Sequence, residues 1–127
     1  MIECQSEAEK YNCKTDINGY IIQSDVTPKK GGQAKGIRPH DILATAYAAC
    51  LNISVQMACD KKQIPVNSVI SKVKLIRENS KTIFKYQIDF KQPLPEDTRK
   101  EILAMIENCP VRRTLSKPIE FQMSEEQ

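Results

Sequence analysis

Residues 38–61 decide the fold of this chain, and they read RPHDILATAYAACLNISVQMACDK. Apolar and small side chains recur there at three-and-four spacing, which places them on one face of an α-helix. These positions are Ile42, Leu43, Ala46, Tyr47, Ala49, Cys50, Ile53, Ser54 and Met57. The first half is rich in alanine, so other backbone can approach it closely on several sides. We therefore predict a long, central and largely buried helix that begins after Pro39 and ends near Lys61, ahead of Pro65.

Two strands joined by a tight turn are predicted before this helix. Residues 11–17 and 20–24 flank Asn18-Gly19, a dipeptide that readily adopts the two positive φ values of a type I′ hairpin turn. Residues 26–39 then contain three glycines, two prolines and four basic residues. This composition predicts a flexible loop, of the kind that often forms the rim of a functional site.

Two strands and a helix are predicted after the central helix. The strands span about residues 69–77 and 82–91, and in the second strand apolar and charged or polar residues alternate. This alternation is typical of a sheet with one buried and one wet face. A second helix over residues 96–108 begins with two acidic residues, which favour a helix N-terminus.

A last strand over residues 118–123 is expected to bury Ile119, Phe121 and Met123. The resulting order is β-β-α-β-β-α-β, which indicates the α+β class. At 127 residues the chain has the length of one domain, so we predict a single domain over residues 1–127. Residues 1–9 and 124–127 are expected to be frayed ends.

Composition and charge exclude several classes of function. The net charge is only +3 and the basic residues are scattered, so we expect no nucleic-acid partner. A helix needs roughly 20 consecutive apolar residues to cross a bilayer, and we interpret the apolar runs of this sequence as too short. We therefore predict no membrane span. An odd number of cysteines, five, without a secretory signal favours a reducing compartment and a cytoplasmic location.

The cysteines differ in their sequence settings. Cys50 and Cys59 are nine positions apart, which puts them about 13 Å apart on opposite sides of one helix, too far for a disulfide. Cys59, Cys13 and Cys4 are interpreted as bystanders, Cys4 because it lies in the tail. There is no C-x-x-C motif, and a lone histidine makes a zinc site improbable, so we expect no metal and no cofactor.

Cys109 stands out because Pro110 follows it. Proline is favoured at the first position of a helix, which would make Cys109 an N-cap. If a helical turn follows, its backbone amides together with the side chains of Arg112 and Arg113 are expected to lower the pKa of Cys109. From these observations alone, ordinary buried thiols are the favoured interpretation of Cys50 and Cys109, and a redox pair remains the alternative.

Two segments resemble the OsmC/Ohr superfamily of thiol peroxidases. The first is the proline-led, alanine-rich helix, RPHDILATAYAAC over residues 38–50, and the second is NCPVRRTL over residues 108–115. In the first, the cysteine lies eleven positions after the proline, and in the second a Cys-Pro-Val run precedes a Thr-Leu pair. The resemblance extends over nearly the whole chain, including the order of strands and helices.

The resemblance implies an OsmC-like fold in an intertwined homodimer and a cysteine-based peroxidase without haem. Cys50 matches the cysteine that attacks an organic hydroperoxide, and Cys109 matches the resolving cysteine. An external dithiol, of lipoyl or thioredoxin-like type, would then reduce the disulfide.

The residues around the thiol depart from the family pattern. Peroxidases of the superfamily typically carry an Arg on an N-terminal strand and a Glu directly after the helix-leading proline. Here no Arg precedes Arg38, and His40 and Asp41 follow the proline. Arg38, oriented by Asp41, and His40 are therefore candidate supporting residues, while a helix-start role for Asp41 and a solvated position for His40 remain open.

Two alternatives follow from these departures. One is an OsmC-fold protein without peroxidase activity, which acts as a redox-responsive or hydrophobic-ligand-binding protein. The other is a small RNA-binding domain, which the chain fits poorly because it has no Gly-x-x-Gly between two helices and no aromatic-rich strand.

Overall fold

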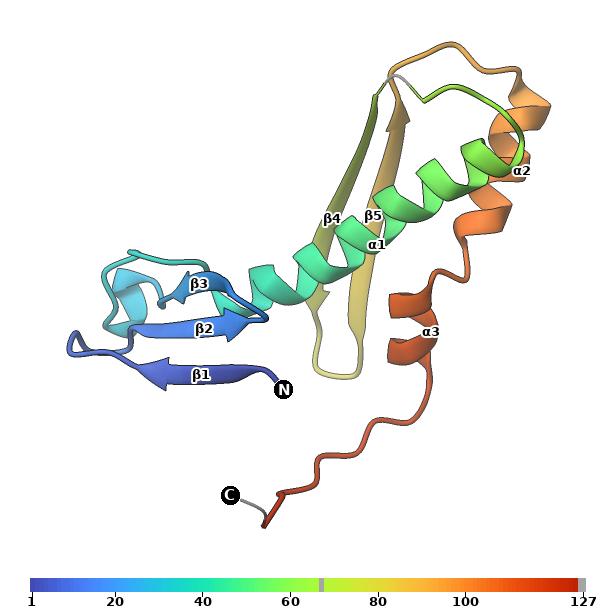
Figure 1. Ribbon diagram of the computed structural model, residues 1–127. Coiled ribbons are helices and arrows are strands. Elements are labelled where there is room, and N and C mark those ends of the chain that lie inside the picture. Colours follow the sequence, from blue (N-terminus) through green and yellow to red (C-terminus); the bar gives the residue numbers. More distant parts are fainter. Residues whose placement is uncertain (67, 126–127) are drawn as a thin grey trace. The chain divides into compact units, whose positions relative to one another are not determined.

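A computed structural model describes residues 1–66 and 68–125 of the chain. It is a mixed α+β structure with two small sheets and several helices (Figure 1). The chain forms two compact units. Unit 1 comprises Met1–Thr45 and Leu75–Phe84, and unit 2 comprises Ala46–Lys74 and Lys85–Gln127. The units are described separately below.

Unit 1 contains an antiparallel sheet with the strand order β1-β2-β3. Its strands are β1 (Glu3–Ser6), β2 (Cys13–Ile17) and β3 (Tyr20–Ser24). The predicted turn between the last two strands is confirmed, because Asn18 has φ 53° and Gly19 has φ 93°. The prediction that residues 1–9 are frayed is wrong for β1, which pairs with β2 over its whole length. Hydrogen bonding to a neighbouring strand therefore orders a segment that has no apolar pattern of its own.

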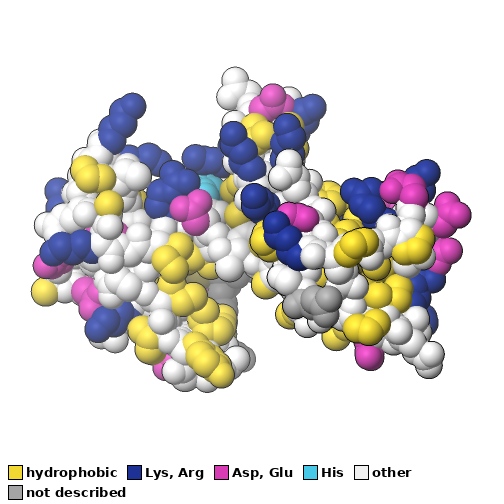
Figure 2. Space-filling view, turned by 90° about the horizontal axis from the view of Figure 1, so that it is seen from above, with side chains coloured by type: hydrophobic (Ala, Val, Ile, Leu, Met, Phe, Trp, Pro, Cys, Tyr) yellow, Lys and Arg dark blue, Asp and Glu magenta, His cyan; other side chains and the backbone are white. Residues whose placement is uncertain are grey.

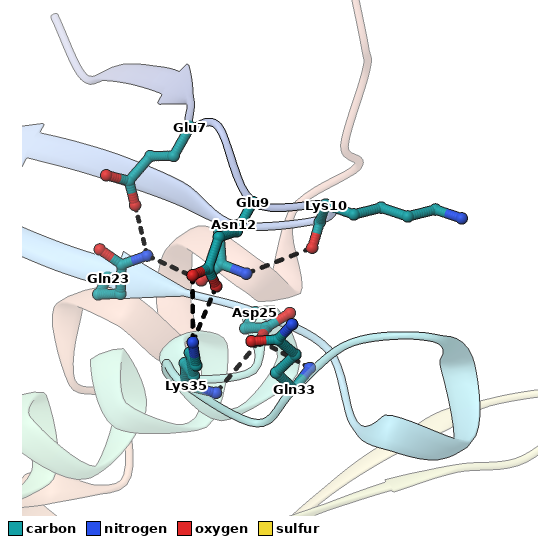
Figure 3. Close-up of polar contacts among 8 residues, drawn as sticks. All are labelled: Glu7, Glu9, Lys10, Asn12, Gln23, Asp25, Gln33 and Lys35. Carbon is teal, nitrogen blue, oxygen red and sulfur yellow. Dashed lines mark hydrogen bonds and ion pairs between the residues drawn. The ribbon is translucent and has the colours of Figure 1, made fainter.

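The loop after β3, predicted to be flexible, has a defined conformation built around Asp25. This carboxylate is 2% exposed. It accepts hydrogen bonds from the backbone N–H groups of Gln33 and Lys35 at 3.0 and 3.1 Å (Figure 3), and from that of Val26 at 2.7 Å. These bonds, that of Lys35 foremost, lower the pKa of Asp25 against the opposing effect of burial. The loop also contains a short 3₁₀ turn, η1 (Pro28–Lys30). One buried carboxylate thus adds three hydrogen bonds to the backbone–backbone bonds that the loop makes within itself and to β3.

The long helix α1 (Pro39–Lys61) matches the predicted helix. Within unit 2, hydrogen bonds join it to strand β4 (Val69–Arg77), which forms a hairpin with β5 (Thr82–Phe90) (Figure 1). The Ser71 hydroxyl donates to the Ala48 carbonyl at 2.7 Å, and the Asn52 amide donates to the Val69 carbonyl at 3.0 Å. The boundaries of β4 agree with the predicted ones.

Only one side of α1 is buried within the chain. The buried residues are Tyr47, Leu51, Val55, Ala58 and Cys59, whereas Ile53 is 51% and Met57 67% exposed. The expectation of a largely buried helix is therefore wrong for the single chain. By length and composition alone, α1 is also apolar enough to cross a membrane, contrary to the prediction. The buried core helix of a soluble protein can have the same length and composition. Among the described residues, none covers the exposed apolar side chains of Ile53 and Met57.

The C-terminal part contains α2 (Glu96–Ile106) and α3 (Pro110–Ser116). Ile102 and Ile106 of α2 are at most 1% exposed and complete the core of unit 2. The predicted strand over residues 118–123 is absent from the described chain. Ile119, Phe121 and Met123 are 56%, 96% and 95% exposed, so the expectation that they are buried is wrong here. Residues 124 and 125 lie outside helices and strands, and residues 126–127 lie outside the described residues.

Charged residues are scattered over the face shown in Figure 2. The Lys and Arg side chains there are interleaved with acidic and hydrophobic ones. No continuous basic surface is visible on this face, which is consistent with the low net charge of +3. The nucleic-acid reading therefore gains no support from this face.

Candidate functional site

Cys50 and the start of α3 meet within unit 2. Cys50 is half-buried in the middle of α1. The backbone N–H of Val111, the second residue of α3, donates to the Cys50 Sγ at 3.5 Å. The first N–H groups of a helix have no partner inside the helix, so this donor is available for a sulfur atom. Two segments 61 residues apart in sequence are thereby joined at one thiol.

Cys109 is the N-cap of α3, as predicted from the following proline. It is 3% exposed. Burial raises the pKa of the Cys109 thiol, and donation of its S–H to the Cys50 sulfur raises it further, whereas the backbone amides of Arg112 and Val111 lower it. The net direction is upward, so the expectation of a lowered Cys109 pKa is wrong: desolvation outweighs the helix amides. Cys109 is therefore held as a neutral thiol beside Cys50.

Two tyrosines and an arginine form one side of the site, and sequence reasoning did not single out the tyrosines. Tyr47 lies one turn before Cys50 and is 3% exposed. Its ring meets that of Tyr86 edge to face, with centroids 5.8 Å apart and planes at 84°. Burial raises the pKa of Tyr47, and the Arg112 guanidinium, which hydrogen-bonds to the phenol, acts in the opposite direction. The sequence does contain an indication for Tyr47. It is three residues before Cys50, and side chains three apart are neighbours on the surface of a helix.

The Arg112 side chain therefore has a different partner from the one expected. It was predicted to act on Cys109, but its charge faces the phenols of Tyr47 and Tyr86. The guanidinium group of arginine is planar and always charged, so it can pack against aromatic rings without losing its charge. Arg112 thus contributes to the thiol site through its backbone amide and holds the tyrosine pair with its side chain.

The candidate supporting residues Arg38, His40 and Asp41 belong to unit 1. Arg38 donates to Asp41 from Nε and Nη2, both at 3.0 Å, so the pair that the sequence suggested is formed. Their hydrogen bond lowers the pKa of Asp41 and raises that of Arg38. Both side chains are more than half exposed, and His40 is exposed too.

Of the other cysteines, Cys59 lies nine residues after Cys50 on α1, and two belong to unit 1. Cys59 is 2% exposed, and burial raises the pKa of its thiol. Cys4 and Cys13 lie on β1 and β2 of unit 1. Among the described residues, no group of three or more His, Cys, Asp or Glu side chains is placed to hold a metal ion.

Comparison with known proteins provides an independent line of evidence. Residues 32–124 match the family model of OsmC-like proteins. A search of curated proteins found no match. Both cysteine segments fall inside the matched range.

Several solved structures share the fold at low sequence identity. A Psychrobacter arcticus protein ascribed to osmotic stress and detoxification responses aligns with a TM-score of 0.76 at 18% identity, over 89% of this chain and 85% of the other. An OsmC-like protein from Mycoplasma pneumoniae aligns with a TM-score of 0.72 at 22% identity, over 91% and 85%. The organic hydroperoxide resistance protein OhrB of Bacillus subtilis aligns with a TM-score of 0.65 at 17% identity, over 91% and 90%. At these identities the likeness establishes the shared fold.

Proposed function

Because this chain belongs to the OsmC-like protein family, we propose that it reduces organic hydroperoxides, with Cys50 as the attacking thiol and Cys109 as the resolving thiol. The observation that carries the proposal is the meeting of Cys50 with the Cys109-capped start of α3, where the Val111 N–H donates to the Cys50 sulfur. Similar structures include proteins named for organic hydroperoxide resistance.

In the first step the Cys50 thiolate attacks the terminal oxygen of the hydroperoxide. The S–O bond forms as the O–O bond breaks, sulfur loses two electrons, and the alkoxide takes up a proton and leaves as an alcohol. The Val111 N–H donates to the Cys50 sulfur at 3.5 Å and fixes its position for attack.

In the second step Cys109 attacks the sulfur of the Cys50 sulfenic acid. An S–S bond forms, the S–O bond breaks, and the hydroxyl leaves as water with the proton of the Cys109 thiol. The raised pKa of Cys109 keeps this thiol protonated, so Cys50 is the cysteine that attacks the peroxide and Cys109 the one that resolves the sulfenic acid. The buried Cys109 reacts only after the half-buried Cys50 has been oxidised.

The neighbourhood of Cys50 favours an apolar substrate. The exposed side chain of Ile53 lies one turn after Cys50 on the same helix and offers apolar surface beside it. An alkyl or aryl group gains free energy against such a surface, whereas hydrogen peroxide has no apolar group to bury. We therefore expect a preference for organic hydroperoxides over hydrogen peroxide.

The proposal includes a homodimer and an external dithiol of lipoyl or thioredoxin-like type, acting in the cytoplasm. The support for a second copy is the exposed apolar surface of unit 2. Ile53 and Met57 on α1, and Phe121 and Met123 near the C-terminus, are each more than half exposed. Large apolar side chains in this number are typical of surfaces that become buried in an assembly.

Turnover measurements with cysteine variants test the proposal. Purified protein is mixed with cumene hydroperoxide or hydrogen peroxide and with dihydrolipoamide, and peroxide loss is followed. We expect turnover that is faster with cumene hydroperoxide, lost in Cys50→Ser and slowed in Cys109→Ser. Cys59→Ala is the matched control, because Cys59 is buried elsewhere on the same helix and its loss should leave the rate unchanged.

No turnover by the wild-type protein, or equal turnover by Cys50→Ser, would contradict the proposal. Either result would favour a redox-responsive or ligand-binding protein that kept the fold without the peroxidase reaction.

A further inference from the structure

Two cysteines of unit 1 lie on the same face of adjacent strands. β1 and β2 are antiparallel, with Cys4 opposite Thr15 and Ser6 opposite Cys13. Residues two apart on a strand share a face, and directly opposed residues also share a face. Cys4 and Cys13 are therefore diagonal neighbours on one face of the sheet, joined by the strand register and not by sequence proximity.

The two thiols differ in exposure and in protonation. Cys4 is exposed, and Cys13 is half-buried. The Thr15 hydroxyl and the Cys13 thiol donate to the Cys4 sulfur and lower the pKa of Cys4. The same contact, followed by burial and by the charges of Glu7 and Asp25, raises the pKa of Cys13. An exposed thiol that ionises readily beside a second, protonated thiol is the usual arrangement in redox-sensing pairs.

We propose that Cys4 and Cys13 form a second redox-active thiol pair, in addition to Cys50 and Cys109, which closes into a disulfide on exposure to an organic hydroperoxide and is reopened by a dithiol. The Cys4 thiolate attacks the terminal peroxide oxygen, the O–O bond breaks, and the alkoxide leaves and takes up a proton. Cys13 then attacks the Cys4 sulfenic acid, and the hydroxyl departs as water with the Cys13 proton. Two electrons pass from the thiols to one peroxide, and an alcohol, a water molecule and one disulfide result.

The position of β1 allows this closure. Diagonal neighbours across two antiparallel strands have Cα atoms about 7–8 Å apart, whereas a disulfide requires roughly 4.4–6.8 Å. β1 must therefore slide along β2, because hydrogen-bonded strands already lie about 4.8 Å apart and cannot approach each other further. It is the edge strand of the sheet, it has four residues, and all of them are exposed (Figure 1). Displacing it disturbs no buried side chain, and the strain that remains makes the disulfide easily reduced again.

The test uses a protein that lacks the first site. In Cys50→Ser/Cys109→Ser, only Cys4, Cys13 and Cys59 remain as thiols. One equivalent of cumene hydroperoxide should remove two thiols and leave Cys59 reduced. After trypsin digestion without reductant, mass spectrometry should find peptide 1–10 linked to peptide 11–14, since cleavage falls after Lys10 and Lys14. Because Cys50 is absent, this result does not depend on whether the proposed peroxidase reaction occurs.

Added substitutions provide matched controls. In that background Cys13→Ser should leave Cys4 as a sulfenic acid that dimedone traps, with no linked peptide. Cys59→Ala should leave the linkage unchanged. At pH 7, Cys4 should react with iodoacetamide at least about tenfold faster than Cys59, and Cys13→Ala should slow Cys4 more than Cys13→Ser, which keeps a donor.

Three outcomes would overturn the proposal. They are the absence of the linked peptide after peroxide treatment, a linkage found only between two chains, and alkylation of Cys4 no faster than that of Cys59.

Discussion

Raising the pH should destabilise the protein through Cys59, and Cys59→Ala should remove this effect. Cys59 is 2% exposed, and burial raises the pKa of its thiol in the folded chain. In the unfolded chain a cysteine ionises near pH 8.5. The folded state therefore holds its proton where the unfolded state has lost it. The stabilisation is complete below pH 8.5 and is lost as the pH rises from there toward the folded value.

The size of the effect follows from linkage. Between pH 8.5 and the folded pKa, one such thiol lowers the free energy of unfolding by at most about 1.4 kcal/mol per pH unit. At pH 7, Cys59→Ala should cost about 1 kcal/mol, because a buried sulfur is removed. The two curves of unfolding free energy against pH should thus converge as the pH rises above 8.5, because only the wild-type protein loses this contribution.

Urea unfolding in the presence of a reductant, at half-unit steps from pH 7 to pH 10, measures both curves. Leu51→Ala is the matched control. This fully buried side chain lies on the same helix and does not titrate, so its removal lowers the unfolding free energy without changing its slope against pH. If Cys59→Ala and the wild-type protein lose stability in parallel over this range, the burial of Cys59 does not control its ionisation and the reasoning fails.

Three further predictions concern the site and the fold. In Cys109→Ser, oxidation of Cys50 by one equivalent of cumene hydroperoxide should proceed at the wild-type rate in stopped flow, while multiple turnover falls about tenfold or more. Gly32→Ala should lower the free energy of unfolding by at least about 2 kcal/mol, because a Cβ there would lie 2.1 Å from a backbone carbonyl oxygen. Gly19→Ala meets no atom within 4 Å and should cost only about 1 kcal/mol, the cost of its positive φ. Leu51→Ala, at 0% exposure, should cost about 2–5 kcal/mol in the same urea assay.

The elements that the sequence predicts well are those with a strong local signal. Strand β3 and its turn follow from Asn18-Gly19, whose positive φ values few other residues adopt readily. Helix α1 follows from its three-and-four spacing, and the N-cap role of Cys109 from the proline after it. The low net charge likewise anticipates the scattered basic residues of Figure 2.

The misses concern segments whose structure depends on a partner. β1 has the sequence ECQS, which contains no alternation of apolar residues, and it becomes a strand only because β2 lies beside it. Residues 118–123 show the opposite case. Their alternation predicts a half-buried strand, but no described strand pairs with them and their apolar residues stay exposed. A periodic pattern states which face seeks burial, and it does not state which surface covers that face.

The site divides in the same way. The sequence identifies Cys50 and Cys109 by their local settings and by the family resemblance, and the structure adds the Val111 donor and the tyrosine pair. The direction of the Cys109 pKa could not be predicted, because it depends on a competition between burial and helix amides. The burial of a single side chain depends on the residues that pack around it in the folded protein, and no sequence motif indicates it.

A peptide map after a single oxidation tests the central claim most directly. Wild-type protein is treated with one equivalent of cumene hydroperoxide, unfolded in urea that contains iodoacetamide so that buried thiols are also alkylated, and digested with trypsin without reductant. We predict one equivalent of cumyl alcohol and a disulfide between the peptide that carries Cys50 and Cys59 and peptide 101–112, with Cys59 alkylated and Cys50 joined to Cys109. Recovery of Cys50 and Cys109 as alkylated thiols, with the peroxide unconsumed, would contradict the account.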